Sequence, residues 1–310
     1  MGFKIYLAKP RGFCAGVERA IEILDLALKK FGPPIYVRHA IVHNEKVVKE
    51  FEKRGAIFVE DIEEIPEKSI LIFSAHGVSP EIREKAKKKK LKVIDATCPL
   101  VTKVHLEAKY YAKNDYLILL IGHKNHVEVQ GTLGEAPDRI IVIEKKEDLD
   151  KLDGKKFEKI AILTQTTLSV DDTKDLITEI QKRFKNIVKP KADDICYATQ
   201  NRQDMVKRIA PFTDIFLVIG SQKSSNSNRL KEIAEKYGAK AYLINDKSEI
   251  PLKEIENIKS LGITSGASTP ESLVQEIIEE LKKYGAEEVI EISGIEENIK
   301  FSLPLELESF

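Results

Sequence analysis

Short, continuously apolar segments that alternate with amphipathic ones restrict this chain to an α/β fold. The apolar runs are uninterrupted, as in strands that are buried on both faces of a parallel sheet. The stretches between them carry helix signals, such as Pro80 after Ser79 and an acidic first turn after Ser169. This alternation predicts βαβ units with mainly parallel sheets. The predicted strands include residues 4–10, 70–75, 92–96, 116–122, 159–165, 214–220 and 260–266.

The size and charge of the chain narrow the classes of function. Its 310 residues leave room for two or three domains, and 50 basic side chains balance 50 acidic ones. Without a net charge, nothing favours a nucleic acid or a membrane as partner. The longest apolar run, residues 116–122, is far shorter than a membrane span, and no signal segment precedes the first predicted strand. We therefore expect a cytoplasmic protein.

Three cysteines follow strand-like runs in similar contexts: "PRGFCAG", "DATCP" and "DDICYAT". An odd count without a secretory signal predicts reduced thiols rather than disulfides. A small buried apolar role would suit any one of Cys14, Cys98 and Cys196, but three in matching positions favour metal binding. Their spacing leaves two choices open: zinc with a histidine as fourth ligand, or an iron–sulfur cluster with one iron left open.

Polar side chains gather just beyond the predicted strands, where parallel sheets bind their ligands. Histidines end several apolar runs, whereas His39, His105 and His123 are typical of structural positions. Capping would require one serine or asparagine per helix, and the run "SSNSN" exceeds that need. These residues predict donors for an anion at helix N-termini, and no nucleotide-binding glycine loop is present. The candidates are His43, His76, His126, Thr164, Gln165, Thr166, Ser224, Ser225, Asn226 and Ser268.

Glu128 lies two residues after His126 and should face the same site. A carboxyl group that is buried near a metal or a diphosphate can stay protonated near neutral pH and act as a proton donor. A solvated surface glutamate is the alternative interpretation.

Seven segments together resemble a known family: "AKPRGFCAGVERAI", "YVRHAIVHNEKVV", "ILIFSAHGVS", "DATCPLVTKVH", "TQTTLSVDDT", "DDICYATQNRQ" and "GSQKSSNSNRL". They are similar to the 4-hydroxy-3-methylbut-2-enyl diphosphate reductases, which act last in the non-mevalonate isoprenoid pathway. The similarity runs from about residue 4 to the final "GIEENIKFSLP". The sequence departs from many family members at Val127 and Gln130, which replace proline and glutamate.

The resemblance implies three similar α/β modules with mainly parallel sheets, arranged as a pseudo-threefold trefoil around a central site. The modules would span residues 14–97, 98–195 and 196–285. The N-terminal strand in residues 1–13 would complete the third module, and residues 286–310 would form a C-terminal tail.

The resemblance also implies one 4Fe–4S cluster per chain, with three cysteine ligands and an open iron for the substrate hydroxyl. The ligands would be Cys14, Cys98 and Cys196. Glu128 would relay a proton, and Thr166 would lie beside the hydroxyl. The diphosphate pocket would comprise His43, His76, His126, Ser224, Ser225, Asn226 and Ser268.

The implied reaction is a two-electron reductive dehydroxylation. It would convert (E)-4-hydroxy-3-methylbut-2-enyl diphosphate to isopentenyl and dimethylallyl diphosphate plus water. The electrons would come from a ferredoxin- or flavodoxin-type protein, and we expect a monomer. Composition and periodicity alone also permit a zinc-dependent phosphohydrolase in which Glu128 activates water, or a non-catalytic redox sensor.

Overall fold

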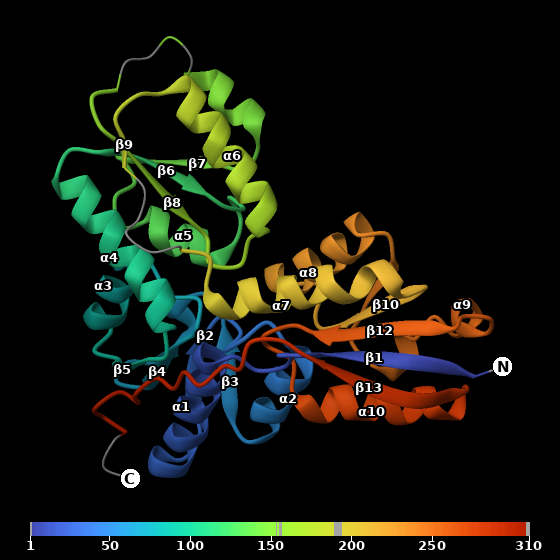
Figure 1. The fold of residues 1–310 in the computed structure, drawn as a ribbon. Helices are drawn as coiled ribbons and strands as arrows, with labels where there is room; N and C mark the ends of the chain where they lie inside the picture. The colour runs from blue at the N-terminus through green and yellow to red at the C-terminus, as the bar shows by residue number, and fades with distance from the viewer. Residues whose placement is uncertain (1, 153, 155–156, 189–193, 308–310) are drawn as a thin grey trace. The chain divides into compact units, whose positions relative to one another are not determined.

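The computed structural model describes residues 2–152, 154, 157–188 and 194–307. Its strands form three sheets, and the strand pairs within the described residues are parallel. Helices connect successive strands (Figure 1). The predicted fold class, α/β with mainly parallel sheets, is confirmed.

The three sheets share one strand order. In the first two sheets, the first strand along the chain lies between the second and the third, and a fourth strand follows the third; the third sheet repeats this order with the N-terminal strand in the fourth position. The first sheet has the order β3-β2-β4-β5, with β2 Ile35–Arg38, β3 Ala56–Val59, β4 Ile70–Phe73 and β5 Lys92–Asp95. The second has the order β7-β6-β8-β9, with β6 Leu117–Ile121, β7 Ile140–Ile143, β8 Ile160–Thr164 and β9 Ile187–Val188.

The third sheet takes its fourth strand from the N-terminus. Its order is β11-β10-β12-β1-β13, with β1 Phe3–Lys9, β10 Ile215–Ile219, β11 Lys240–Ile244, β12 Ser260–Ser265 and β13 Ala286–Ser293. The N-terminal strand therefore pairs with β12 on one side and β13 on the other. Residues 286–293, which belong to the C-terminal tail that the resemblance implies for 286–310, form β13 at the edge of this sheet.

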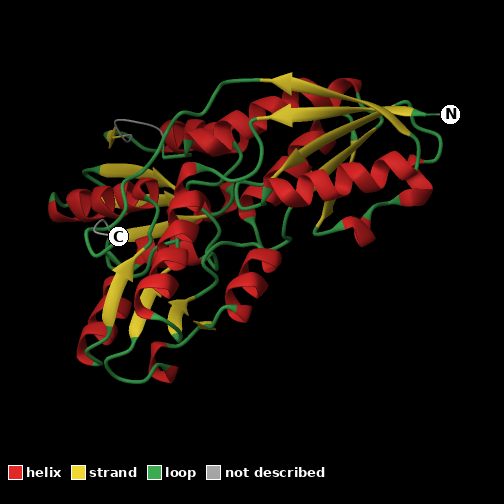
Figure 2. Ribbon diagram, turned by 90° about the horizontal axis from the view of Figure 1, so that it is seen from below, coloured by secondary structure: helices red, strands yellow, loops and turns green. Residues whose placement is uncertain are grey.

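The helices lie on both faces of the sheets (Figure 2). In the third sheet, α10 packs with Ile5, Leu217 and Ile263 on one face, while α7 and α8 pack with Phe216 and Val218 on the other. The helices are α1 Ala15–Phe31, α2 Glu45–Lys53, α3 Pro80–Lys88, α4 Pro99–Lys113, α5 Val127–Leu133, α6 Val170–Arg183, α7 Tyr197–Ile209, α8 Ser225–Lys236, α9 Leu252–Ile255 and α10 Glu271–Lys283. Short 3₁₀ segments cover Ile62–Glu64, Lys146–Leu152, Ala210–Phe212 and Lys247–Glu249.

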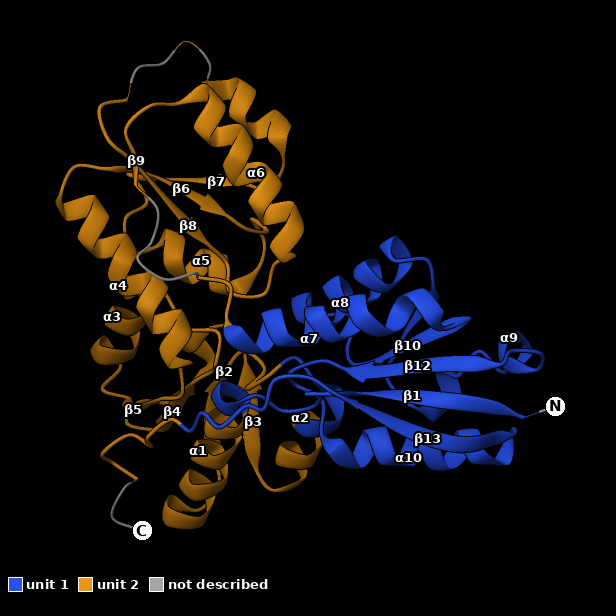
Figure 3. Ribbon diagram, in the orientation of Figure 1, with its two compact units in different colours: residues 1–17, 43–47, 197–300 blue, residues 18–42, 48–196, 301–310 orange. Residues whose placement is uncertain are grey.

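The chain divides into two compact units (Figure 3). The first comprises residues 1–17, 43–47 and 197–300 and contains the third sheet; the second comprises residues 18–42, 48–196 and 301–310 and contains the other two. The module boundaries expected from the sequence stay a prediction. None of the described helices combines the length and the apolar character that crossing a membrane requires.

The local predictions hold with one correction. All seven predicted strands are present, and Ser169 caps α6 by accepting a hydrogen bond from the Asp172 N–H. Ser79 occupies the capping position of α3, but among the described residues its side chain makes no capping hydrogen bond. Pro80 at the first helical position, with its fixed φ, favours that start without one.

Candidate active site

Each sheet has a point where the chain reverses the direction in which it adds strands. These points lie between β2 and β4, between β6 and β8, and between β10 and β12. Open parallel sheets bind ligands beyond the carboxyl ends of the strands that flank such a point. The predicted site residues outside the cysteines follow these strands along the chain: His43, His76, His126, Glu128, Thr166, Ser224, Ser225, Asn226 and Ser268.

Glu128 and Thr166 meet beyond β6 and β8. Glu128 lies in the first turn of α5, and only 4% of it is exposed. The Thr166 N–H donates to Glu128 Oε1 at 2.6 Å, and Thr166 Oγ1 donates to Oε2 at 3.0 Å. Burial raises the pKa of Glu128 to about 7, although the two bonds from Thr166 oppose that rise. The carboxyl can therefore hold or release a proton near neutral pH.

His126 is held as a neutral imidazole. It caps α5, and its Nδ1 accepts a hydrogen bond of 3.2 Å from the Glu128 N–H. Burial, with smaller contributions from His123 and His39, lowers the pKa of His126 to about 4. Because Nδ1 accepts, the neutral ring carries its proton on Nε2, which makes Nε2 a hydrogen-bond donor.

His76 lies close to His126 in the same unit. The centroids of the two rings are 6.2 Å apart and the rings are nearly perpendicular. Ser74 Oγ lies 3.2 Å from His76 Nδ1 and orients that ring. Two imidazoles at this spacing can both reach one anionic group.

The first unit carries the predicted serine and asparagine residues at the start of α8. Ser224 is the N-cap and accepts a hydrogen bond from the Ser227 N–H at 3.3 Å. Ser225 begins the helix, and Asn226 is 97% buried. Neither the Nδ2 nor the Oδ1 atom of Asn226 has a hydrogen-bond partner among the described residues. Since buried polar groups are normally paired, this amide is suited to bind a ligand.

The loop after β12 joins this group through Ser268. Its Oγ donates to the backbone carbonyl of His43 at 3.1 Å. Both residues belong to the first unit. The contact therefore joins two predicted site residues that lie on different loops.

The three cysteines occupy equivalent places in the repeated fold. Each follows the fourth strand of its sheet and directly precedes a helix: Cys14 before α1, Cys98 before α4 and Cys196 before α7. None of them forms a disulfide within the described part of the chain, and all three are half-buried. The partial positive charge at a helix N-terminus stabilises a thiolate, the form that binds metals.

Several groups around Cys14 affect the pKa of its thiol. Burial raises the pKa of its thiol, while the Arg202 guanidinium and the N–H groups of Val17 and Gly16 oppose that rise. These groups would stabilise a negatively charged sulfur site. Cysteine thiolates are therefore suited to bind a soft metal centre. That all three thiols bind the same centre stays a prediction.

Sequence reasoning missed a buried charged cluster near Cys196. Asp194 accepts hydrogen bonds of 2.9 Å from the Thr164 N–H and from Lys103 Nζ. Burial, followed by the neighbouring Asp194, raises the pKa of Glu107 to about 7. The only signal in the sequence was the position of Asp194 two residues before a cysteine.

The histidines assigned to structural positions have carboxylate neighbours. His105 Nδ1 lies 2.7 Å from Glu135, and His39 Nδ1 lies 2.7 Å from Glu60. His105, for which the sequence offered no partner, is buried in α4. Its contact with Glu135 accounts for a polar ring in that position.

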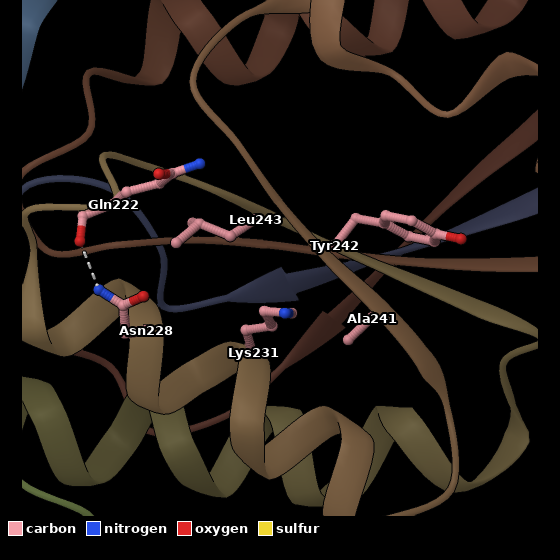
Figure 4. Close-up of a pocket in the computed structure, with 6 residues that line it drawn as sticks. All are labelled: Gln222, Asn228, Lys231, Ala241, Tyr242 and Leu243. Atoms are coloured by element: carbon pink, nitrogen blue, oxygen red, sulfur yellow. Dashed lines mark hydrogen bonds between the residues drawn. The ribbon is translucent and has the colours of Figure 1, made fainter.

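A cavity of about 430 Å³ lies beside α8 and the edge strand β11 (Figure 4). Asn228 Nδ2 donates to the Gln222 carbonyl at its rim, at 2.7 Å. None of the lining residues is a predicted site residue, so the cavity is no part of the candidate active site. They are Gln222, Asn228, Lys231, Ala241, Tyr242 and Leu243.

Comparison with known proteins identifies the family. The family model described as "LytB protein" matches residues 5–282. The chain belongs to the LytB protein family. Curated relatives named 4-hydroxy-3-methylbut-2-enyl diphosphate reductase include those of Aeromonas salmonicida and Methylococcus capsulatus, each 52% identical with 98% of both chains covered. The relative of that name from Rhodopirellula baltica is also 52% identical, over 99% of this chain and 96% of its own.

Two solved structures are similar as well. The E-1-hydroxy-2-methyl-but-2-enyl-4-diphosphate reductase of Plasmodium falciparum matches with a TM-score of 0.95 and 44% identity, over 99% of this chain and 97% of that one. A structure of (E)-4-hydroxy-3-methyl-but-2-enyl diphosphate reductase matches with a TM-score of 0.65 and 34% identity, over 91% of this chain and 100% of that one. The resemblance read from the motifs is confirmed.

Proposed function

We propose that this chain reduces (E)-4-hydroxy-3-methylbut-2-enyl diphosphate to isopentenyl and dimethylallyl diphosphate. In this reaction the bond from C4 to its hydroxyl oxygen breaks and a new C–H bond forms. Two electrons and two protons are consumed, and one water leaves. Full-length identity of 52% to reductases of that name makes the chain an oxidoreductase. The observation that carries the specific reaction is the buried Glu128–Thr166 pair, a proton donor poised near neutral pH.

We assign Cys14, Cys98 and Cys196 as ligands of one 4Fe–4S cluster with an open iron. Their equivalent positions at helix N-termini support this assignment. When bound, such a cluster supplies electrons singly and a Lewis-acidic iron for the substrate hydroxyl.

Glu128 supplies the proton that lets the hydroxyl oxygen leave as water. Its pKa of about 7 matches the requirement that a general acid be protonated in a useful fraction of molecules near neutral pH. Thr166 donates two hydrogen bonds to the carboxylate that remains after proton transfer, and so stabilises the product state. Thr166 also places a hydroxyl group beside the substrate's own.

The diphosphate is bound by side-chain donors together with the first turn of α8. The residues assigned to this role are His43, His76, His126, Ser224, Ser225, Asn226 and Ser268. The unpartnered amide of Asn226 supports this role, because a phosphate oxygen would satisfy its buried Nδ2.

The partners of the reaction are the allylic diphosphate and an electron-carrying protein of the ferredoxin or flavodoxin type. We retain a monomer in the cytoplasm as part of the proposal. A reductase needs an outside source of two electrons, and the motifs of the chain include no nucleotide-binding glycine loop.

The proposal is tested by purifying the full chain without oxygen and measuring iron, sulfide and zinc. We expect about four irons per chain and a broad absorbance band near ~400 nm. With a chemical one-electron reductant, the protein should convert the substrate to both products, which chromatography separates. A colourless protein that holds zinc after attempted reconstitution and hydrolyses the diphosphate would replace this proposal with a zinc-dependent phosphohydrolase.

A further inference from the structure

A completely buried arginine holds the backbone of the Cys14 loop. Arg202 lies on α7 with 0% of its surface exposed. Its Nη2 donates to the Gly12 carbonyl at 2.8 Å, and its Nη1 donates to the Ala198 carbonyl at 2.8 Å. Nη1 also donates to both carboxylate oxygens of Glu297, at 3.0 and 3.2 Å. These contacts lie within the first unit.

The turn at Gly12 is held by the hydrogen bond from Arg202 and by two further hydrogen bonds. Gly12 has a φ of +69°, a conformation that favours glycine. Its N–H donates to Ser265 Oγ at 2.8 Å, and the Cys14 N–H donates to the Ala267 carbonyl at 3.2 Å. Arg202 is the one charged group among these anchors, so it can affect Cys14 through its charge as well as through geometry.

Glu297 balances that charge from the segment that follows β13. Its side chain is 13% exposed, and it also accepts a hydrogen bond of 3.0 Å from Asn201 Nδ2. A buried guanidinium without a carboxylate would be costly, which explains why the segment is held there. Arg202 bonds directly to the Cys14 loop at the Gly12 carbonyl, whereas Glu297 bonds to Arg202 and Asn201 on α7.

The same arrangement recurs in the second unit at Cys98. Arg19 Nη1 donates to the carbonyl of Thr97 at 3.1 Å, and Arg19 Nε donates to the Ser302 carbonyl at 2.7 Å. In both units an arginine therefore links a carbonyl just before a cysteine to the C-terminal segment.

We propose that Arg202 is a positioning residue that holds the Cys14 loop and raises the reduction potential of the metal centre, with Glu297 moderating its charge. The inference rests on the proposed function, because it requires a redox centre on Cys14. Reduction adds negative charge to such a centre, and a buried positive charge nearby stabilises the reduced form. Removing Arg202 should lower the potential, and neutralising Glu297 should raise it.

The experiment compares Arg202→Met and Glu297→Gln with the parent, each reconstituted without oxygen. Redox titration followed by absorbance and electron paramagnetic resonance gives the midpoint potential, and iron and sulfide assays give cluster content. We expect each variant to change the ratio of reduced to oxidised cluster at a fixed potential by about tenfold, in opposite directions. For a one-electron couple this corresponds to about 59 mV.

The control variants lie on the same segments as the tested residues. Arg208 is also on α7 and donates to the Ser293 carbonyl at 3.0 Å, and Glu296 is the exposed neighbour of Glu297. Arg208→Met and Glu296→Gln should leave the potential unchanged. Arg202→Lys, which keeps the charge but loses the two-pronged contact, should keep the potential closer to the parent value and lose cluster more readily in air.

The outcomes separate this inference from the proposed function. If the parent never binds iron and sulfide, the proposed function fails. If the parent binds a cluster but Glu297→Gln lowers the potential or leaves it unchanged, the inference is wrong. If Arg202→Met does not fold, Glu297→Gln still tests the sign of the change in reduction potential. Arg202→Lys still tests whether a positive charge at this position keeps the potential near the parent value.

Discussion

Replacement of Glu128 by glutamine should abolish most turnover while making the protein more stable. The glutamine amide is isosteric with the carboxyl group, so its carbonyl can still accept from the Thr166 N–H, and its NH₂ can donate to Thr166 Oγ1. What it lacks is a transferable proton. Since a positioned general acid contributes about 100- to 10,000-fold, we expect a rate loss in that range with unchanged cluster content.

The stability gain follows from the raised pKa. Burial moves the pKa of Glu128 from 4.5 to about 7, and each pKa unit corresponds to about 1.4 kcal/mol. Below pH 4.5 the carboxyl is protonated in the folded and unfolded states, so it adds no cost. Between pH 4.5 and 7 the unfolded chain releases the proton first, and the folded state loses up to about 3 kcal/mol of stability. Glutamine removes this loss.

The assay pairs kinetics with unfolding. Single-turnover reduction of the substrate, started with a chemically reduced cluster, isolates the chemical step. Urea unfolding of the metal-free protein between pH 4.5 and 8 should show a smaller decline of stability with pH in Glu128→Gln than in the parent.

Glu107 offers a matched control, because burial and Asp194 also raise its pKa to about 7 in the same unit. Glu107→Gln should reproduce the change in pH dependence while it retains normal turnover. Turnover of Glu128→Gln within a few-fold of the parent would refute the assignment of Glu128 as the proton donor.

Three further substitutions and one control variant test separate parts of the account. Cys98→Ser should fold, because serine is a good N-cap for α4, but it should lose the iron, the sulfide and the ~400 nm absorbance. Val127→Pro should leave turnover unchanged and shift the free energy of unfolding by no more than about 1 kcal/mol, since Val127 is the first residue of α5. Asn226→Ala should weaken pyrophosphate binding about tenfold by calorimetry without reducing stability, because the amide is buried and unpartnered. Asn228→Ala removes an amide whose Nδ2 donates to the Gln222 and Ser224 carbonyls just before α8, and it should leave that binding unchanged.

The strands that the sequence predicted are those whose signal is local. The runs at β4, β5, β6, β8, β10 and β12 are continuous enough to indicate burial on both faces without knowledge of any partner. Strands β2, β3, β7 and β11 were not among them, and strand length does not explain the difference, since the predicted strands β4 and β5 also have four residues. The edge strand β13 has mostly exposed side chains, and its pairing with β1 depends on the opposite end of the chain.

The sequence by itself determined the kinds of chemical group that this protein carries and their order along the chain. The sequence alone showed three thiols before predicted helices, a carboxyl two residues after a histidine, and a run of serine and asparagine. Each of these features depends only on neighbouring residues. The tertiary structure decided which of them interact. The pKa of Glu128 depends on burial and on Thr166, which lies 38 residues away, and the anchoring of the Cys14 loop depends on Arg202, 190 residues from Gly12. Desolvation and long-range hydrogen bonds arise only when the parallel strands pair, so no local pattern could have specified them.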